Sequence, residues 1–217
     1  MTTIKETLPI LDRTKTAMIV VDMQNGFLDD EGSMVKTGMD ITELKKTVVP
    51  VSRLVEACHR VDVPTIFTRM VQRADYKDAG LRLERRPILK EIGSLVAGTW
   101  DMELDPRMVV KPEDYILDKN RYSAFYNTNL EVILRGLAVD TLIICGVTTE
   151  ICVESTIRDA YFRDYKVLVP EDAVAAMDVA RHQGTLLTIQ YGFGTVTRTA
   201  EVIDSLGVTV GAETHSH

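Results

Sequence analysis

The chain has 217 residues, with 25 Lys and Arg against 32 Asp and Glu, which gives a formal net charge of −7. Hydrophobic residues make up 45% and charged residues 26% of it, proportions that exclude disordered, collagen-like and coiled-coil proteins and predict a soluble globular one. The acidic balance also argues against a general surface for nucleic acid or anionic lipid. At about 100–200 residues per domain, this length predicts one domain.

No segment of the chain predicts a membrane span or a secretory signal. The longest purely apolar stretches, at 17–21 and 142–145, are far shorter than the ~20 residues that a membrane helix needs. Residues 1–15 mix Lys, Glu, Asp and Pro and lack the apolar core of a signal peptide. Three cysteines, an odd number, do not fit a disulfide framework. We therefore expect a cytoplasmic protein.

Short β-branched runs alternate with helical patterns along the chain. The runs predict strands at residues 17–22, 64–70, 114–118, 141–147, 166–169 and 194–197. Apolar residues three and four positions apart predict helices at residues 41–61, 129–137, 149–164, 173–190 and 200–206. Pro50 should kink the first helix or mark its first turn. This alternation predicts an α/β fold, a three-layer doubly wound parallel sheet with helices on both faces.

Residues 72–105 interrupt the alternation. They are polar, carry clusters of charge and scattered glycines, and predict a long excursion with at most short helices. Segments of this length inside compact domains are usually lids or binding loops, so we expect the excursion near the active site. With no repeat or linker elsewhere, residues 1–217 are predicted to form a single domain, in which 1–15 are an N-terminal extension and 208–217 a tail.

Three reactive side chains follow predicted strands. Asp22 ends the first strand, Lys119 follows the strand at 114–118, and Cys152 comes soon after the strand at 141–147. In open α/β sheets, ligands bind beyond the carboxyl ends of the strands. An acid, a cation and a thiol are therefore expected at one edge of the sheet.

Cys152 should lie in the first turn of a helix, on a polar flank away from the apolar stripe. The positive end of the helix dipole and nearby N–H groups lower the pKa of a thiol there and favour thiolate. Cysteines are also common as small buried hydrophobes, which is how we interpret Cys58 and Cys145. Asp22 could equally cap a helix or pair with a cation, and Lys119 could be solvated. No histidine is an obvious partner for the thiol, which leaves Asp22 as the candidate base.

Three blocks of sequence resemble the signature regions of the isochorismatase-like cysteine hydrolases. They are VVDMQNGF (residues 20–27), DKNRYSAF (residues 118–125) and GVTTEICVESTIRDAYFRDYKVLVPEDA (residues 146–173). The resemblance extends over about residues 16–206 and implies a parallel sheet flanked by helices. It also implies a catalytic triad at Asp22, Lys119 and Cys152, and assembly into a homodimer or homotetramer.

The resemblance further implies a non-proline cis peptide between Val147 and Thr148. The N–H groups of Thr148 and Cys152 would then form an oxyanion hole. Isochorismatases proper typically lack the cysteine, and nicotinamidases carry a histidine metal site where residues 68–75 here contain no histidine. We therefore expect neither a metal nor another cofactor.

The members that the chain resembles best act on ureido or carbamoyl groups: ureidoacrylate amidohydrolases, biuret and triuret hydrolases, and N-carbamoylsarcosine amidohydrolases. This implies a cysteine-dependent amidohydrolase that cleaves a C–N bond of a small linear ureide or carbamoyl amide through a thioester, releasing ammonia or an amine. Two alternatives stay open. The triad could act on an ordinary small carboxamide, or the scaffold could be a thiol or ligand-binding protein without hydrolysis.

The clues to the substrate disagree. Residues 98–104 and 121–135 resemble ureidoacrylate amidohydrolases, whereas Gln190 falls where biuret hydrolases place a substrate-binding glutamine. Gln24 could also bind a ureido group, or it could be structural. The other candidates for substrate contacts are an apolar wall and three arginines for a substrate carboxylate: Phe27, Trp100, Tyr122, Arg69, Arg73 and Arg121.

Overall fold

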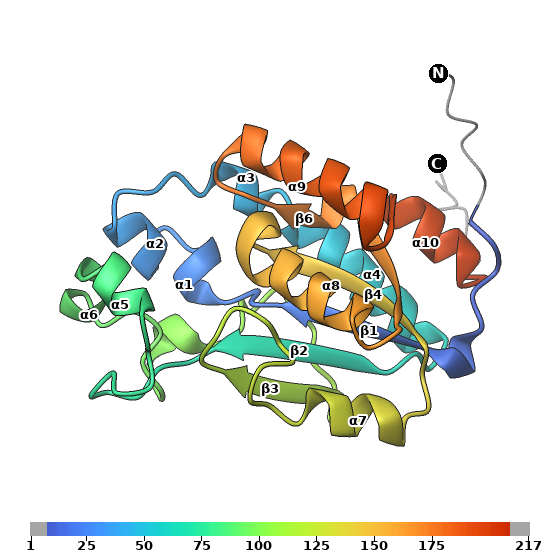
Figure 1. The fold of residues 1–217 in the computed structure, drawn as a ribbon, viewed down its shortest axis with the longest axis horizontal. Coiled ribbons are helices and arrows are strands. Elements are labelled where there is room, and N and C mark those ends of the chain that lie inside the picture. Colours follow the sequence, from blue (N-terminus) through green and yellow to red (C-terminus); the bar gives the residue numbers. More distant parts are fainter. Residues whose placement is uncertain (1–7, 209–217) are drawn as a thin grey trace, which may run out of the picture.

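The computed structural model describes residues 8–208 and contains one parallel sheet of seven strands. The strand order is β3-β2-β1-β4-β5-β7, and β6 also pairs with β4 (Figure 1). The strands are β1 (Thr16–Val21), β2 (Thr65–Met70), β3 (Tyr115–Lys119), β4 (Thr141–Val147), β5 (Lys166–Pro170), β6 (Val174–Ala175) and β7 (Thr195–Thr197). The predicted parallel α/β sheet is confirmed.

Helices cover both faces of this sheet (Figure 1). On one face α4 (Val48–Arg60) packs against α10 (Thr199–Ser205), and on the other α8 (Glu154–Tyr161) packs against α9 (Val179–Gly192). A further helix, α7 (Leu130–Gly136), connects β3 to β4. The remaining helices are short: η1 (Arg13–Lys15), α1 (Asn25–Leu28), α2 (Ser33–Lys36), α3 (Thr42–Lys45), α5 (Arg82–Arg85), α6 (Ile88–Glu91), η2 (Trp100–Met102), η3 (Thr149–Val153) and η4 (Glu171–Ala173).

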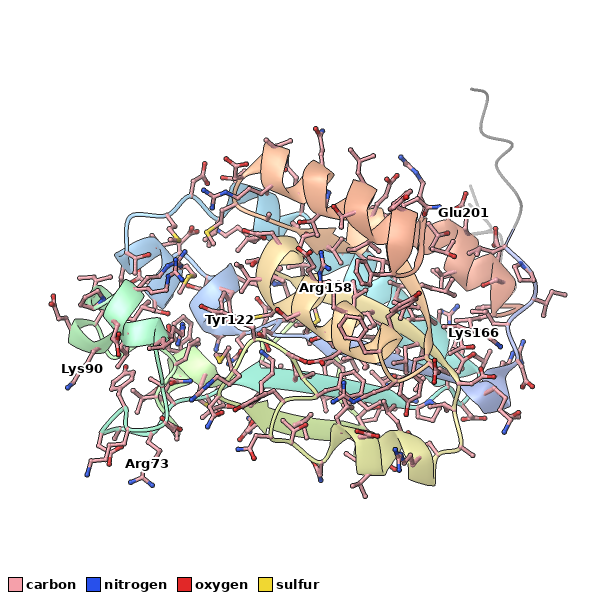
Figure 2. The ribbon with its side chains drawn as sticks, viewed as in Figure 1. Arg73, Lys90, Tyr122, Arg158, Lys166 and Glu201 are labelled. Carbon is pink, nitrogen blue, oxygen red and sulfur yellow. The ribbon has the colours of Figure 1, made fainter. Side chains whose placement is uncertain are left out.

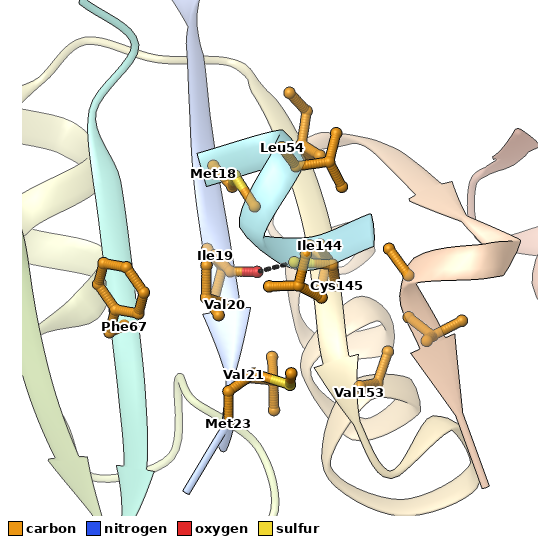
Figure 3. Packing of buried hydrophobic residues seen from close by; sticks show 14 of the residues in the cluster. Met18, Ile19, Val20, Val21, Met23, Leu54, Phe67, Ile144, Cys145 and Val153 are labelled. Atoms are coloured by element: carbon orange, nitrogen blue, oxygen red, sulfur yellow. Dashed lines mark hydrogen bonds between the residues drawn. The ribbon is translucent and has the colours of Figure 1, made fainter. Parts of the chain in front are cut away.

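The core is centred on β1 and β4, whose residues are all buried because helices cover both sides. Their continuous apolar runs, without alternation, are typical of central parallel strands. Cys145 lies in this core with its thiol 3.8 Å from the carbonyl oxygen of Ile19 (Figure 3). Cys58 is equally buried, and burial raises the pKa of its thiol to about 12. Both cysteines therefore act as small hydrophobic residues, as predicted.

Gly146 allows β1 and β4 to approach closely. Its φ is +109°, and a Cβ placed there would lie 2.1 Å from the carbonyl oxygen of Val21, its register partner. We expect Gly146→Ala to lower the free energy of unfolding by at least about 2 kcal/mol, since both the conformation and the contact exclude a side chain. Urea denaturation measures this loss.

Gly136 is the matched control for that measurement. It is the last residue of α7, it is exposed, and nothing lies within 4 Å of a Cβ placed on it. Gly136→Ala should leave stability unchanged or raise it by up to about 1 kcal/mol. Equal effects of the two substitutions would contradict the close-approach argument.

Some elements differ from the sequence-based expectation. The helix predicted at 173–190 begins only at Val179, because Val174 and Ala175 form β6 beside β4. The helix predicted at 41–61 is two helices, α3 and α4, and Pro50 lies in the first turn of α4, where a missing N–H costs little. The short helices α1 and α2 were not predicted. Residues 1–7 and 209–217, parts of the predicted extension and tail, lie outside the described residues.

Candidate active site

The carboxyl ends of the central strands gather the predicted catalytic side chains. Asp22 directly follows β1, Lys119 ends β3, and Cys152 lies in the η3 turn that follows β4. The short helices α1, α2, α5 and α6 lie at this same edge, on the left in Figure 1. The excursion at 72–105 contains α5, α6 and η2 and so contributes to the surroundings of the site.

Asp22 and Lys119 form an ion pair with both side chains fully buried. Lys119 Nζ donates to Asp22 Oδ2 at 2.7 Å and to the carbonyl oxygen of Arg121 at 3.2 Å. The other carboxylate oxygen of Asp22 accepts from Thr68 Oγ1 at 2.8 Å. Burial lowers the pKa of Lys119, but the negative charge of Asp22 and the Cys152 sulfur outweigh it, so this pKa is raised and Lys119 keeps its charge. The carboxylate is thus held in one orientation by two partners.

The backbone at Asp22 has φ +52°, in the left-handed region. Aspartate tolerates this region better than most residues, and such conformations are frequent at functional sites. This left-handed residue turns the chain away from the direction of β1. The N–H of Asp22 still continues the pairing with β2, because it donates to the carbonyl oxygen of Thr68 at 3.1 Å.

The Cys152 thiol lies beside this ion pair. Only 5% of the residue is exposed, and the charges of both Asp22 and Lys119 act on the thiol. Its carbonyl oxygen accepts from Thr156 Oγ1 at 2.7 Å, and Thr156 Oγ1 in turn accepts from the N–H of Ala124 at 3.0 Å. Asp22, Lys119 and Cys152 are therefore brought together from three separate strands.

The prediction that Cys152 has a lowered pKa and rests as a thiolate was wrong. Burial raises the pKa of Cys152 to about 12 and outweighs the positive charges of Lys119 and Arg82, which lower it. The negative charge of Asp22 raises it further. The resting thiol therefore keeps its proton and has a carboxylate as neighbour, the arrangement of a nucleophile with its base.

The peptide bond between Val147 and Thr148 is cis, and Thr148 is buried at the end of β4. Thr148 directly precedes the η3 turn that carries Cys152. The oxyanion hole of Thr148 and Cys152 N–H groups stays a prediction.

Gln24 is structural, which corrects its candidacy as a substrate contact. Its side-chain amide donates to the carbonyl oxygens of Met70 at 3.0 Å and Met102 at 2.8 Å, and its Oε1 accepts from the N–H of Met70 at 2.7 Å. Both donor hydrogens and the carbonyl are thus used inside the protein, where Gln24 is fully buried. This side chain links the end of β2 to η2.

Gln190 lies away from the triad, so its assignment to the substrate was wrong. Gln190 lies near the C-terminal end of α9, and its Oε1 accepts a hydrogen bond from the N–H of Val196 in β7 at 2.6 Å. It lines a groove of about 1190 Å³ whose lining residues include none of the triad. The direction of α9 explains this position. A helix that connects two parallel strands runs antiparallel to them, so the C-terminal residues of α9, including Gln190, lie at the edge of the sheet where the strands begin.

The predicted apolar wall is only partly enclosed. Phe27 in α1 is buried in the core, whereas Trp100 in η2 is 49% exposed and Tyr122 is 41% exposed. Tyr122, labelled in Figure 2, follows the end of β3 by three residues. Tyr122 is also close enough to Arg82 for the two groups to interact electrostatically.

Two of the predicted carboxylate-binding arginines have acidic partners of their own. Arg69 makes a two-bond pair with Asp118, at 2.7 and 3.1 Å. Arg73 pairs in the same way with Asp75, at 3.0 Å for both bonds, and points away from the body of the protein (Figure 2). Neither guanidinium is left unpaired for a substrate.

Arg121 holds the excursion in place. Its guanidinium donates to the carbonyl oxygens of Asp78 and Asn120 and lies against Gly80, where a Cβ would come within 2.7 Å of it. The arginine that sequence reasoning missed is Arg82 in α5, whose Nη1 is buried without a hydrogen-bond partner. Only its position in a charged excursion could have drawn attention to it.

Within residues 8–208, no group of three or more His, Cys, Asp or Glu side chains is arranged to hold a metal ion. In the same part of the chain, no helix combines the length and apolarity that crossing a bilayer requires.

Comparisons with known proteins agree with this geometry. Residues 16–201 match the model of the Isochorismatase domain. The chain is 32% identical over 211 residues to ureidoacrylate amidohydrolase RutB of Methylobacterium radiotolerans, with 91% of this chain and 82% of the relative covered. It is also 32% identical to ureidoacrylate amidohydrolase RutB of Agrobacterium fabrum, with 91% of both chains covered.

Two solved structures have the same fold. A cysteine hydrolase from Pseudomonas syringae pv. phaseolicola superposes with a TM-score of 0.85 at 35% identity, over 93% of this chain and 96% of the other. N-carbamoylsarcosine amidase from Thermoplasma acidophilum gives a TM-score of 0.70 at 31% identity, over 85% and 96%. The chain therefore belongs to the isochorismatase family of hydrolases.

Proposed function

We propose that this hydrolase is a cysteine-dependent amidohydrolase that cleaves a C–N bond of a small linear ureide or carbamoyl amide. The observation that carries the proposal is the buried set of Asp22, Lys119 and Cys152, in which the thiol lies close to an ion pair of a carboxylate and an ammonium group. A thiol or ligand-binding protein without hydrolysis would not need the carboxylate. The set fits a nucleophile, a base and a charge that orients the base.

In the first half of the reaction, Asp22 takes the proton of the Cys152 thiol and the sulfur attacks the substrate carbonyl. The tetrahedral intermediate then collapses, the C–N bond breaks, and Asp22 delivers its proton to the departing nitrogen. Ammonia or an amine leaves, and a thioester to Cys152 remains.

In the second half, Asp22 takes a proton from water, and the resulting hydroxide attacks the thioester. The C–S bond breaks, and the proton returns from Asp22 to the sulfur. Lys119 keeps its charge throughout and stabilises negative charge on either partner. The N–H groups of Thr148 and Cys152 would hold the oxyanion, each worth about 3–4 kcal/mol of barrier.

Two observations narrow the substrate. The curated relatives are named for ureidoacrylate and one structural neighbour for N-carbamoylsarcosine. The sequence clue to biuret rested on Gln190, which lies away from the triad. We therefore place ureido and carbamoyl acids ahead of biuret and triuret. The predicted dimer or tetramer stays a prediction.

The proposal is tested by ammonia or amine release from a substrate panel: ureidoacrylate, N-carbamoylsarcosine, biuret, triuret and a simple carboxamide. We expect turnover of at least one ureido or carbamoyl compound and none by Cys152→Ser, which retains the size of the side chain. Cys145→Ser is the matched control, because Cys145 lies in the core and should matter only for stability. Turnover of the carboxamide alone would favour the alternative that the triad acts on ordinary small carboxamides. Hydrolytic activity of Cys152→Ser near that of the wild type would refute the cysteine mechanism.

A further inference from the structure

Arg82 carries a buried guanidinium nitrogen that nothing in the described chain satisfies. It is the first residue of α5, and its Nη1 has no hydrogen-bond partner within residues 8–208. Arginine stays charged in proteins, and an unpaired buried charge is costly. By contrast, Arg69, Arg73 and Arg121 all have partners. We therefore interpret this unpaired guanidinium nitrogen as a donor that pairs with a bound ligand.

The position of Arg82 places that group at the active site. Gly80, two residues before Arg82, lies against the guanidinium of Arg121. The carbonyl oxygen of Arg121 accepts a hydrogen bond from Lys119 Nζ at 3.2 Å. The charge of Arg82 also acts on the Cys152 thiol and on Asp22. Arg82 therefore lies at the same edge of the sheet as the triad.

The segment that carries Arg82 is fixed at this edge of the sheet. Asp101 accepts from the N–H of Leu95 at 2.7 Å and from the N–H of Ser33 at 2.8 Å, which ties the excursion to α2. Tyr76 donates its hydroxyl to the carbonyl oxygens of Leu89 and Ser94. These bonds hold the excursion around α5 and α6 in shape, so the guanidinium is presented in a defined place.

We propose that Arg82 binds a carboxylate of the substrate, at the end away from the bond that is cleaved, so that the substrate is a ureido or carbamoyl acid. The inference rests on the proposed amidohydrolase function and specifies its substrate class. A planar guanidinium forms paired, charge-assisted hydrogen bonds with a carboxylate. Biuret and triuret are uncharged. When bound, they would shield Arg82 further from solvent without giving its guanidinium a charge partner.

The test compares Arg82→Met with Arg85→Met, an exposed arginine of the same helix. Each variant is assayed on ureidoacrylate and on its uncharged methyl ester, following cleavage of the ureido group. We expect Arg82→Met to lower kcat/KM for the acid at least ~30-fold and to change that for the ester by no more than about threefold. Arg85→Met should leave both values near those of the wild type.

A thermal melt of the same variants separates binding from structure. Removing an unpaired buried charge should leave the Tm of Arg82→Met equal to or above that of the wild type. A clear fall in Tm, or an equal loss on acid and ester, would show that Arg82 supports the fold or the thiol and would overturn the assignment.

Two further outcomes concern the substrate itself. If the wild type cleaves neutral ureides as well as it cleaves ureido acids, the Arg82 assignment fails while the amidohydrolase function stands. If the wild type cleaves no ureido or carbamoyl compound, the proposed function fails and the assignment fails with it.

Discussion

Asp22→Asn should lose most hydrolytic activity and yet make the Cys152 thiol easier to alkylate. Without a base, kcat should fall about 10²–10⁴-fold, the usual contribution of a positioned general base. At the same time the negative charge that raises the thiol pKa disappears, while Lys119 still lowers it. The two readouts therefore move in opposite directions, which loss of structure would not produce.

The measurement is the rate of iodoacetamide alkylation against pH, beside steady-state hydrolysis. In the wild type, the Cys152 pKa of about 12 means that the thiolate fraction grows as the pH rises towards that value. In Asp22→Asn the same curve should shift to lower pH. Asp140→Asn, an exposed aspartate that pairs with Lys166, is the control and should shift neither readout. Near wild-type hydrolysis by Asp22→Asn would refute the assignment of the base.

Lys119→Met should destabilise the fold as well as stop turnover. Both members of the Asp22–Lys119 pair are fully buried, and removing one leaves a carboxylate without its charge partner, at a cost of about 3–5 kcal/mol. Lys166→Met is the control: Lys166 pairs with Asp140 at 3.3 Å on the exposed surface, at the end of the molecule away from the excursion (Figure 2). Exposed pairs contribute about 0–1 kcal/mol.

The double variant Asp22→Asn/Lys119→Met should recover much of the lost stability but no activity, since it removes the unpaired charge along with the base. Chemical denaturation of the four proteins gives the coupling free energy of the pair. The pKa of Lys119 is raised above 10.5, so the stabilisation is complete below that pH and is lost as the pH rises through the folded value. Additive effects of the two substitutions would mean that the pair is not coupled.

The sequence predicts the sheet and the triad because both depend on local signals. The strand at 141–147 matches β4 residue for residue, since a continuous apolar run fits a strand covered on both faces. Asp22 and Lys119 were found because they stand at strand ends, which a parallel sheet brings to one edge. Neither inference needed a tertiary contact.

The sequence-based predictions that were wrong or incomplete concern properties that depend on neighbouring residues in the folded protein. The thiol pKa depends on burial, which the helix-end argument for Cys152 left out. Gln190 was placed by position in the sequence, without the direction of α9. Arg82 looked like one charge among several in the excursion, and only its missing partner distinguishes it.

The enclosed ion pair and thiol have one consequence for the energetics of the reaction. Before proton transfer the three groups carry one negative and one positive charge, on Asp22 and Lys119. Afterwards the sulfur holds the negative charge and the sum is still zero. The chemistry thus shifts charge over a short path without creating net charge in a medium of low dielectric constant, so solvent need not reorganise around a new ion.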